Sequence, residues 1–327
     1  LNTQWKFTNV EDLNEGMTPY PFLDSYSDAK WANVTLPHTA YVEPLVVIKP
    51  WKGQSWYRKL ITAYPDWQDK KVILHFEGVM QLAEIWLNGK HIFSHKGGYL
   101  PFAVDLSQSL RHDKPNLLVV LTDNSEQADV PPGKPIEELD FCYYSGIYRN
   151  VYLSSSHKVH ISDPVLTNKS ISGTSVTFPE VEASQSQIAF STAVANELEQ
   201  DAYIETEWML LDAENHIQGR FKTPVQKTEA GTESVFKGNI KLLQPVLWSP
   251  ENPYLYTLLI SVYTDGKLVD SDTLKTGIRK FELSGNTFLL NGKPYRLYGT
   301  NRHQEYPYLG NAISDNAQYR DAVKIRE

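Results

Sequence analysis

Residues 288–310 read Phe288-Leu-Leu-Asn-Gly-Lys-Pro-Tyr-Arg-Leu-Tyr-Gly-Thr-Asn-Arg-His-Gln-Glu-Tyr-Pro-Tyr-Leu-Gly310. Two apolar, strand-like runs flank Asn291-Gly292, a dipeptide that favours a two-residue type I′ turn because both residues tolerate positive φ. The second run ends in the polar cluster Asn-Arg-His-Gln-Glu at 301–305. Barrels and open sheets place their chemistry at the ends of strands, so this stretch predicts a hairpin that leads into a candidate site.

The residues after Gly310 predict one helix. Ser314 can cap it, and Tyr319, Ala322 and Val323 fall on one face at helical spacing. A hairpin, a polar strand end and a helix together are the opening of a β/α unit, and such a helix needs a sheet to pack on. We therefore expect residues 278–327 to begin a further, truncated domain.

The rest of the sequence predicts two all-β units, at 1–155 and 156–277. The expected strands are 55–63, 71–77, a hairpin at 83–94 around Asn88-Gly89, 116–123 (buried on both faces), 150–154, 188–196, 203–212 and 256–263, with a further hairpin turn at Asp265-Gly266. Short strands without long helical periodicity favour an antiparallel sandwich or jelly roll for the first unit. The second unit has the length of an immunoglobulin-like sandwich, although it holds no cysteine pair.

The composition describes a globular chain of two or three domains. Its 327 residues are 41% hydrophobic and 21% charged, and no run approaches the ~18 apolar residues of a membrane span. A net charge of −8 gives no electrostatic support to nucleic-acid binding. Cys142 is the only cysteine, which excludes an intramolecular disulfide and a thiolate metal cluster. These features fit the cytoplasm or a bacterial periplasm, and the location stays open.

Several short phrases are more specific than their strands require, and their order matters more than any one of them. They are Trp31-Ala-Asn-Val-Thr-Leu-Pro-His38, Trp56-Tyr-Arg-Lys59, Phe76-Glu-Gly-Val79, Trp86-Leu-Asn-Gly89, His95-Lys-Gly-Gly-Tyr-Leu-Pro-Phe102, Ser145-Gly-Ile-Tyr-Arg-Asn-Val-Tyr-Leu153, Leu247-Trp-Ser-Pro-Glu-Asn-Pro-Tyr-Leu-Tyr256, Gly277-Ile-Arg-Lys280, and Asn291-Gly-Lys-Pro294 with Asn301-Arg-His303. This ordered set resembles the N-terminal half of glycoside hydrolase family 2, the β-galactosidase and β-glucuronidase family. The resemblance covers essentially the whole chain and leans to the β-galactosidases.

The resemblance implies a jelly-roll sugar-binding-like domain at 1–155, an immunoglobulin-like β-sandwich at 156–277 and the truncated start of a (β/α)8 catalytic barrel at 278–327. The family hydrolyses terminal β-linked sugars with retention of configuration, using one glutamate as acid/base and a second as nucleophile. Both glutamates of the family lie on barrel strands beyond Glu327. We therefore assign no catalytic residue here and expect the chain to be inactive on its own.

Two positions match sugar-contacting residues of the family. Asp140, six residues before Gly146, matches an aspartate that reaches the sugar and in some β-galactosidases binds sodium. A carboxylate can accept a hydrogen bond from a sugar hydroxyl or share a hard cation. His303 matches a histidine that contacts hydroxyls of the terminal sugar, and a neutral imidazole can both donate and accept. Without the resemblance, Asp140 would be a solvated loop acid and His303 a strand-end histidine bonded to backbone.

Three further residues have supporting roles in this interpretation. Asn301 and Arg302 are expected to orient the strand end, and Trp51 is either an aromatic platform for a second sugar or a locally packed side chain. No cofactor is required in this part of the chain, and Na⁺ or Mg²⁺ is a candidate ion in the full-length enzyme, which can also be a homo-oligomer. The expected partner is a carbohydrate, a β-galactoside or related glycan. The alternatives are a β-glucuronidase or β-mannosidase of the same family, or a non-catalytic carbohydrate-binding β-sandwich protein.

Overall fold

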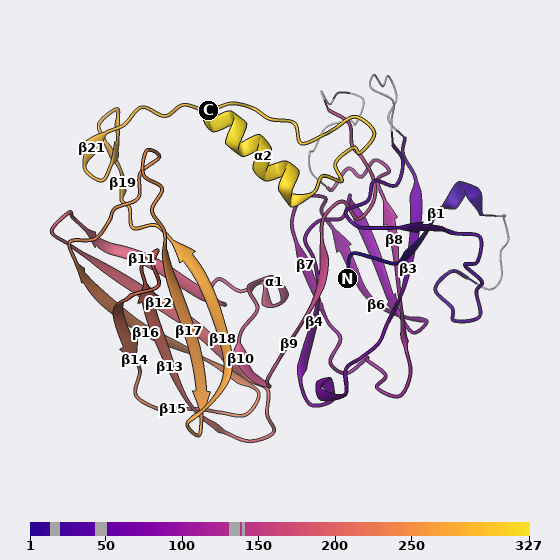
Figure 1. Cartoon of the computed structure of the whole chain (residues 1–327). Coiled ribbons are helices and arrows are strands. Elements are labelled where there is room, and N and C mark those ends of the chain that lie inside the picture. Colours follow the sequence, from indigo (N-terminus) through magenta and orange to yellow (C-terminus); the bar gives the residue numbers. More distant parts are fainter. Residues whose placement is uncertain (14–19, 43–50, 131–137, 139–140) are drawn as a thin grey trace. The chain divides into compact units, whose positions relative to one another are not determined.

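The computed structural model describes residues 1–13, 20–42, 51–130, 138 and 141–327. Its contacts divide the chain into two compact units, one formed by Leu1–Ser155 with Asn301–Glu327 and the other by Ser156–Thr300. Each unit is built mainly of β-strands, which confirms the predicted fold class (Figure 1). The predicted domain boundaries and the start of a barrel stay predictions, because a compact unit is not by itself an independently folding domain.

The first unit is a sandwich of two sheets in its described residues. The larger sheet has the strand order β2-β1-β3-β8-β5-β6 and the smaller one the order β7-β4-β9. The strands are β1 (Trp5–Asn9), β2 (Ala32–Val34), β3 (Gln54–Ile61), β4 (Lys71–Phe76), β5 (Leu82–Leu87), β6 (Lys90–Lys96), β7 (Phe102–Asp105), β8 (Asn116–Asp123) and β9 (Val151–Ser156), with short 3-10 turns η1 (Val10–Asp12) and η2 (Pro65–Trp67). The two layers lie side by side in the indigo-to-magenta part of Figure 1.

The inner faces of these two sheets make the core of the first unit. Tyr57 and Leu118 from the larger sheet pack with Leu74 and Phe76 from β4, and all four are fully buried. In β8 the first five residues are buried in succession, which confirms the expectation of a strand covered on both faces. Each such apolar side chain stabilises the fold by roughly 1.5–3 kcal/mol relative to its exposed form.

The second unit is also a sandwich. One sheet has the order β10-β12-β11 with β16 paired to β12, and the other has the order β14-β13-β17-β18 with β15 paired to β13. Its elements are β10 (Val159–Ile161), α1 (Pro164–Thr167), β11 (Thr174–Val181), β12 (Gln185–Asn196), β13 (Ala202–Leu211), β14 (Ile217–Lys222), β15 (Gln226–Thr228), β16 (Thr232–Leu243), β17 (Tyr256–Thr264) and β18 (Lys267–Thr276). Trp208 is fully buried between the sheets, and its Nε1 donates to Thr192 Oγ1 at 3.0 Å. The indole therefore fills the core without an unsatisfied donor.

Residues 288–310 form the predicted turn and only part of the predicted strands. Strands β19 (Phe281–Ser284), β20 (Thr287–Leu290) and β21 (Lys293–Pro294) make a small sheet, and Asn291 and Gly292 have φ values of 50° and 75°, as a type I′ turn requires. The second apolar run is not a long strand, because no further strand in the described residues pairs with it. Its Leu297 and Tyr298 are 67% and 81% exposed.

The predicted C-terminal helix is α2 (Asp315–Arg326), the yellow helix of Figure 1. The Ser314 side chain accepts a hydrogen bond from the Ala317 backbone N–H, so the predicted cap is confirmed. The predicted apolar face is not covered in the described residues, since α2 has no buried residue and Tyr319 is 74% exposed. No described helix is long and apolar enough to cross a membrane.

Gly146 holds a position that only glycine fits. Its φ is +112°, and a Cβ there would lie 2.7 Å from the backbone oxygen of His38 and 2.7 Å from Tyr57 Oη. We expect Gly146→Ala to lower the free energy of unfolding by about 3 kcal/mol or more, because backbone strain and overlap with a carbonyl add. Denaturant unfolding of the chain measures this loss.

Gly89→Ala is the matched control for this variant. Gly89 lies in the same unit at φ +84°, but its Cβ would meet nothing nearer than 3.7 Å. We expect this variant to lose only the left-handed backbone penalty, about 1–2 kcal/mol. Equal losses in the two variants would contradict the steric account of Gly146.

Burial of His38 makes the stability of the first unit depend on pH. His38 Nδ1 lies 2.9 Å from Tyr57 Oη, and desolvation lowers the pKa of the imidazole from 6.5 to about 4. Between these values the unfolded chain binds a proton that the folded chain does not, so stability is lost as the pH falls from 6.5 to about 4. This loss of stability amounts to at most about 3 kcal/mol, and it should be absent in the His38→Gln variant, which has no imidazole to protonate. Urea unfolding at stepped pH gives the slopes, and identical slopes in both proteins would refute the assignment.

Candidate functional site

A pocket of about 330 Å³ lies within the first unit, where the C-terminal segment meets the sandwich. It is lined by Tyr99, Phe141, Cys142, Arg302, His303, Gln304, Glu305 and Asn311. Its wall therefore joins parts of the chain that are far apart in sequence. A concave site of this size suits a small molecule. The polar cluster singled out in the sequence contributes four of its lining residues, at 302–305.

His303 is an accessible group in this pocket. Its side chain is 47% exposed, and the ring of Phe141 packs against it edge-on at 5.8 Å. Its Nδ1 lies 3.9 Å from Glu305 Oε1, which is too far for a hydrogen bond. Among the described residues no group hydrogen-bonds to the His303 ring, so one nitrogen can donate to a ligand hydroxyl while the other accepts.

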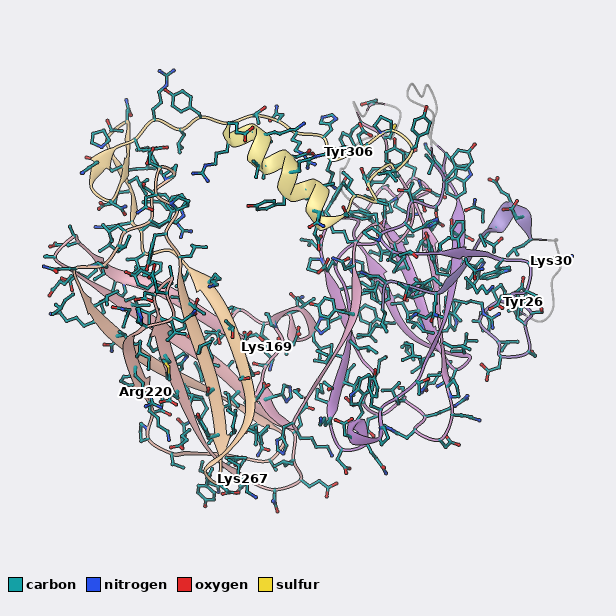
Figure 2. The ribbon with its side chains drawn as sticks, viewed as in Figure 1. Tyr26, Lys30, Lys169, Arg220, Lys267 and Tyr306 are labelled. Carbon is teal, nitrogen blue, oxygen red and sulfur yellow. The ribbon has the colours of Figure 1, made fainter. Side chains whose placement is uncertain are left out.

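Arg302 anchors this segment to α2. Its Nε donates to Asp321 Oδ2 at 3.0 Å and its Nη1 donates to Gln318 Oε1 at 2.8 Å, while Nη2 also bonds to Asp321. Tyr306 donates its hydroxyl to the other oxygen of Asp321 and lies beside α2 in Figure 2. The hydrogen bonds from Tyr306 and Arg302 hold the pKa of the Asp321 carboxyl below its usual value. Three of the five guanidinium donors are thus engaged on the helix.

The same segment is also tied to the sandwich. Arg149 Nη2 donates to Gln304 Oε1 at 2.9 Å, and Thr39 Oγ1 donates to the backbone oxygen of Leu309 at 2.7 Å. At Gly310, φ is +57° and a Cβ would lie 2.8 Å from Thr39 Oγ1, so the chain passes close to the sandwich there. Residues 302–310 are therefore fixed at both ends, and His303 stands between the two attachments.

The aromatic wall of the pocket was not identified from the sequence. The rings of Tyr99 and Tyr143 meet edge-on at 6.4 Å, and Tyr143 donates its hydroxyl to Gln81 Oε1 at 2.8 Å. Burial, and secondarily the neighbouring Tyr148, raises the pKa of Tyr99 to about 12. Its hydroxyl therefore stays protonated at neutral pH. The phrase at 95–102 contains Tyr99, and Tyr143 lies just before the phrase at 145–153. Nothing in the local sequence separates an aromatic residue of a pocket wall from one of the core.

The remaining predicted site residues are placed as follows. Asp140 lies outside the described residues, although Phe141 and Cys142, which follow it in sequence, line the pocket. Asn301 is not among the lining residues. Trp51 is not among them either: its ring stacks on Tyr41 at 5.7 Å and its Nε1 donates to Glu11 Oε1 at 3.3 Å. The structure thus brings His303 and Arg302 together and leaves Trp51 in a separate aromatic pair.

Side chains that could ligate a metal are known for the described residues only. In that part of the chain no group of three or more histidine, cysteine, aspartate and glutamate side chains could hold an ion. The one residue predicted to bind sodium, Asp140, lies outside the described residues.

The sequence matches two models of one family, in the order of the two sandwiches. Residues 2–157 match the sugar binding domain of glycosyl hydrolases family 2, and residues 169–279 match glycosyl hydrolases family 2. Together these matches span most of both compact units. The family predicted from the ordered phrases is confirmed.

Similar proteins are glycosidases that are much longer than this chain. A β-galactosidase of Thermoanaerobacter pseudethanolicus is 31% identical over 98% of this chain and 41% of its own length. A β-glucuronidase of Bacteroides fragilis is 28% identical over 90% of this chain and 41% of its own length. The structure of Bacteroides uniformis β-glucuronidase 2 covalently bound to cyclophellitol-6-carboxylate aziridine superposes with a TM-score of 0.88 and 28% identity, over 100% of this chain and 38% of that one. This chain spans less than half the length of each of these relatives, and it belongs to glycoside hydrolase family 2 as an N-terminal portion.

Proposed function

We propose that this chain is the N-terminal portion of a retaining exo-β-glycosidase that hydrolyses terminal β-linked sugars, with β-galactosides as its substrates. The observation that supports this most is His303, which stands accessible in a pocket on a segment fixed at both ends. A retaining glycosidase needs two carboxylic acids, one to protonate the leaving oxygen and one to form the glycosyl-enzyme bond. In this proposal both belong to a barrel of the longer protein, and this chain contributes substrate contacts.

The contacts follow from the chemistry of the pocket. His303 binds a hydroxyl of the terminal sugar, and its distance of 3.9 Å from Glu305 Oε1 leaves room for that hydroxyl to hydrogen-bond to either group. Phe141 limits the tilt of the imidazole through its edge-on contact. Asp140 accepts a hydrogen bond from a second hydroxyl or shares a sodium ion, and this part of the proposal rests on the family resemblance.

The charges of the pocket favour a neutral sugar over an acidic one. A glucuronide carries a carboxylate, which needs a positive partner when it leaves water. Among the described lining residues Arg302 is the one with a fixed positive charge, and Asp321 and Gln318 already engage it. Glu305 adds a carboxylate on the same wall. The β-galactosidase of T. pseudethanolicus supports the neutral sugar, whereas the Bacteroides relatives make a β-glucuronidase the second candidate.

The 327-residue chain should show no turnover of 4-nitrophenyl β-D-galactoside. Both reacting carboxylates are assigned to the barrel, and without them the glycosidic bond is neither protonated nor attacked. Release of 4-nitrophenolate is the measurement, with the longer protein as positive control. Hydrolytic activity that co-purifies with the chain through two different chromatographic steps would overturn the assignment of both carboxylates to the barrel.

In the longer protein, His303→Ala should lower kcat/KM for 4-nitrophenyl β-D-galactoside by roughly 10- to 100-fold, the effect of losing about 1.4–2.7 kcal/mol of hydrogen bonding. His216→Ala is the matched control, because His216 is a solvent-exposed histidine of the second unit that pairs with Asp212. It should keep the wild-type value. The unmodified protein should prefer the galactoside to 4-nitrophenyl β-D-glucuronide. The reverse preference would favour the second candidate, and equal values for both histidine variants would remove His303 from the site.

A further inference from the structure

A second pocket of about 350 Å³ lies in the first unit and shares no lining residue with the pocket of His303. It is on the outer face of the larger sheet. Along β3, Tyr57 points into the core, whereas Arg58 and Leu60 line this second pocket. The segment 23–28 covers part of the same face. The second pocket thus lies between that segment and the outside of the sheet.

Arg58 is the buried centre of the second pocket. It is 4% exposed, its Nη1 donates to the backbone oxygen of Tyr26 at 2.9 Å, and its Nη2 donates to that of Leu23 at 3.3 Å. Nη1 also lies 3.1 Å from Asp28 Oδ2. The positive charge of Arg58 is therefore compensated by Asp28, and this pair holds the covering segment on the sheet.

Two more cations line the second pocket, and their charges are weakly compensated. Arg111 Nη1 lies 3.5 Å from Asp24 Oδ2, and these side chains are 34% and 59% exposed. Lys114 lines the pocket and makes no ion pair within the described residues. Three cations against two carboxylates leave the second pocket with a net positive charge, although the whole chain carries −8. This local charge suits an anion.

The other side of the second pocket is apolar. Leu60 is 67% exposed there, beside Pro115 and Leu117. The ring of Tyr26 is held by Arg58, whose guanidinium lies 5.4 Å from the ring centre, and by an edge contact with Trp31 at 5.5 Å. Tyr26 lies at the outer margin of this unit (Figure 2). A positioned aromatic ring with aliphatic neighbours fits the C–H face of a sugar ring, while charged groups bind its polar substituents.

We propose that the second pocket binds an acidic sugar unit, a saccharide that carries a carboxylate or a sulfate. The anion pairs with Arg111 and Lys114 and replaces Asp24 as the partner of Arg111. Two oxygens of a carboxylate or sulfate can accept paired hydrogen bonds from one guanidinium, which is a stronger contact than the single Asp24 oxygen at 3.5 Å. The sugar ring packs on Tyr26 and Leu60. The site holds a charged glycan on the protein while a terminal sugar is cleaved elsewhere. That role rests on the proposed function, whereas the binding itself does not.

The test is a titration of the chain with sodium D-glucuronate, D-galactose 6-sulfate, D-galactose and inorganic sulfate, followed by ligand-observed NMR at fixed ionic strength. Both acidic sugars, or one of them, should bind, and the double variant Arg111→Gln, Lys114→Gln should bind at least tenfold more weakly. Asp24→Asn should bind more tightly, because the carboxylate that competes for Arg111 is gone. Raising the salt concentration should weaken binding, because the cations are solvent-exposed.

Lys30→Gln and His303→Ala are the matched controls. Lys30 is an exposed lysine outside both pockets, and His303 belongs to the other one, so neither variant should change the affinity for acidic sugars. The Arg111, Lys114 and Asp24 side chains are at the surface, so thermal unfolding should stay at the wild-type temperature. If His303→Ala has no effect on galactoside hydrolysis in the longer protein, the result counts against the proposed function. It does not bear on the proposed binding of acidic sugars in the second pocket.

Each result has a fixed meaning. If glucuronate alone binds, the ligand of the second pocket is a carboxylated sugar. If D-galactose 6-sulfate alone binds, the ligand is a sulfated sugar. An affinity that the double variant leaves unchanged would overturn the site. Inorganic sulfate that binds as tightly as D-galactose 6-sulfate would overturn the recognition of a sugar. D-galactose that binds to the His303→Ala variant as tightly as the acidic sugars do would overturn the role of charge. No binding by either acidic sugar would overturn the inference as a whole.

Discussion

The hydrogen bonds that fasten residues 302–310 at both ends decide where the chemistry of this chain can lie. Arg302 is bonded to Asp321 and Gln318 of α2, and Thr39 of the sandwich holds the backbone of Leu309. The contact between Thr39 and Leu309 joins segments that are 270 positions apart in the sequence. Without these hydrogen bonds the pocket would keep the aromatic residues Tyr99 and Phe141 but would lose its polar wall, because His303 and Glu305 belong to the fastened segment. Polar contacts of this kind give a fixed geometry more than they give stability, since each contributes a net ~1 kcal/mol.

Much of the fold could be predicted because its strands carry local signals. Asn88-Gly89, Asp265-Gly266 and Asn291-Gly292 all have positive φ at both residues, as the dipeptides indicated. The expected strands at 116–123 and 203–212 became β8 and β13, and both supply apolar side chains to the cores. Strand β16 escaped prediction because half of its twelve residues are polar and its conformation depends on pairing with β12 along its whole length. For the run after Asn291-Gly292 the prediction of a long strand was wrong for the opposite reason. The run contains apolar residues, but no described strand pairs with it beyond β21.

Residues of the candidate site could be predicted only where one short sequence phrase matched the family. His303 could be named from Asn301-Arg-His303, and it lines the pocket. Tyr99, Phe141 and Cys142 could not, because their role arises when two distant segments meet, and a lone sequence does not encode that meeting in any local pattern. The sequence predicts Trp51 either as a sugar platform or as a locally packed side chain, and its ring stacks on Tyr41. Its aromatic character alone suits both roles equally. The charged pocket around Arg58 gave no sequence signal, because its residues are spread from Asp24 to Leu117.

Cys142 lines the pocket of His303 and is the only cysteine of the 327 residues. A thiol-directed fluorophore or spin label therefore has a single attachment point in the whole chain, and that point faces the proposed sugar site. No residue has to be removed or introduced to place such a probe. The molecule thus carries a natural reporter position, through which the arrival of a ligand can be followed as a change in the signal of one label.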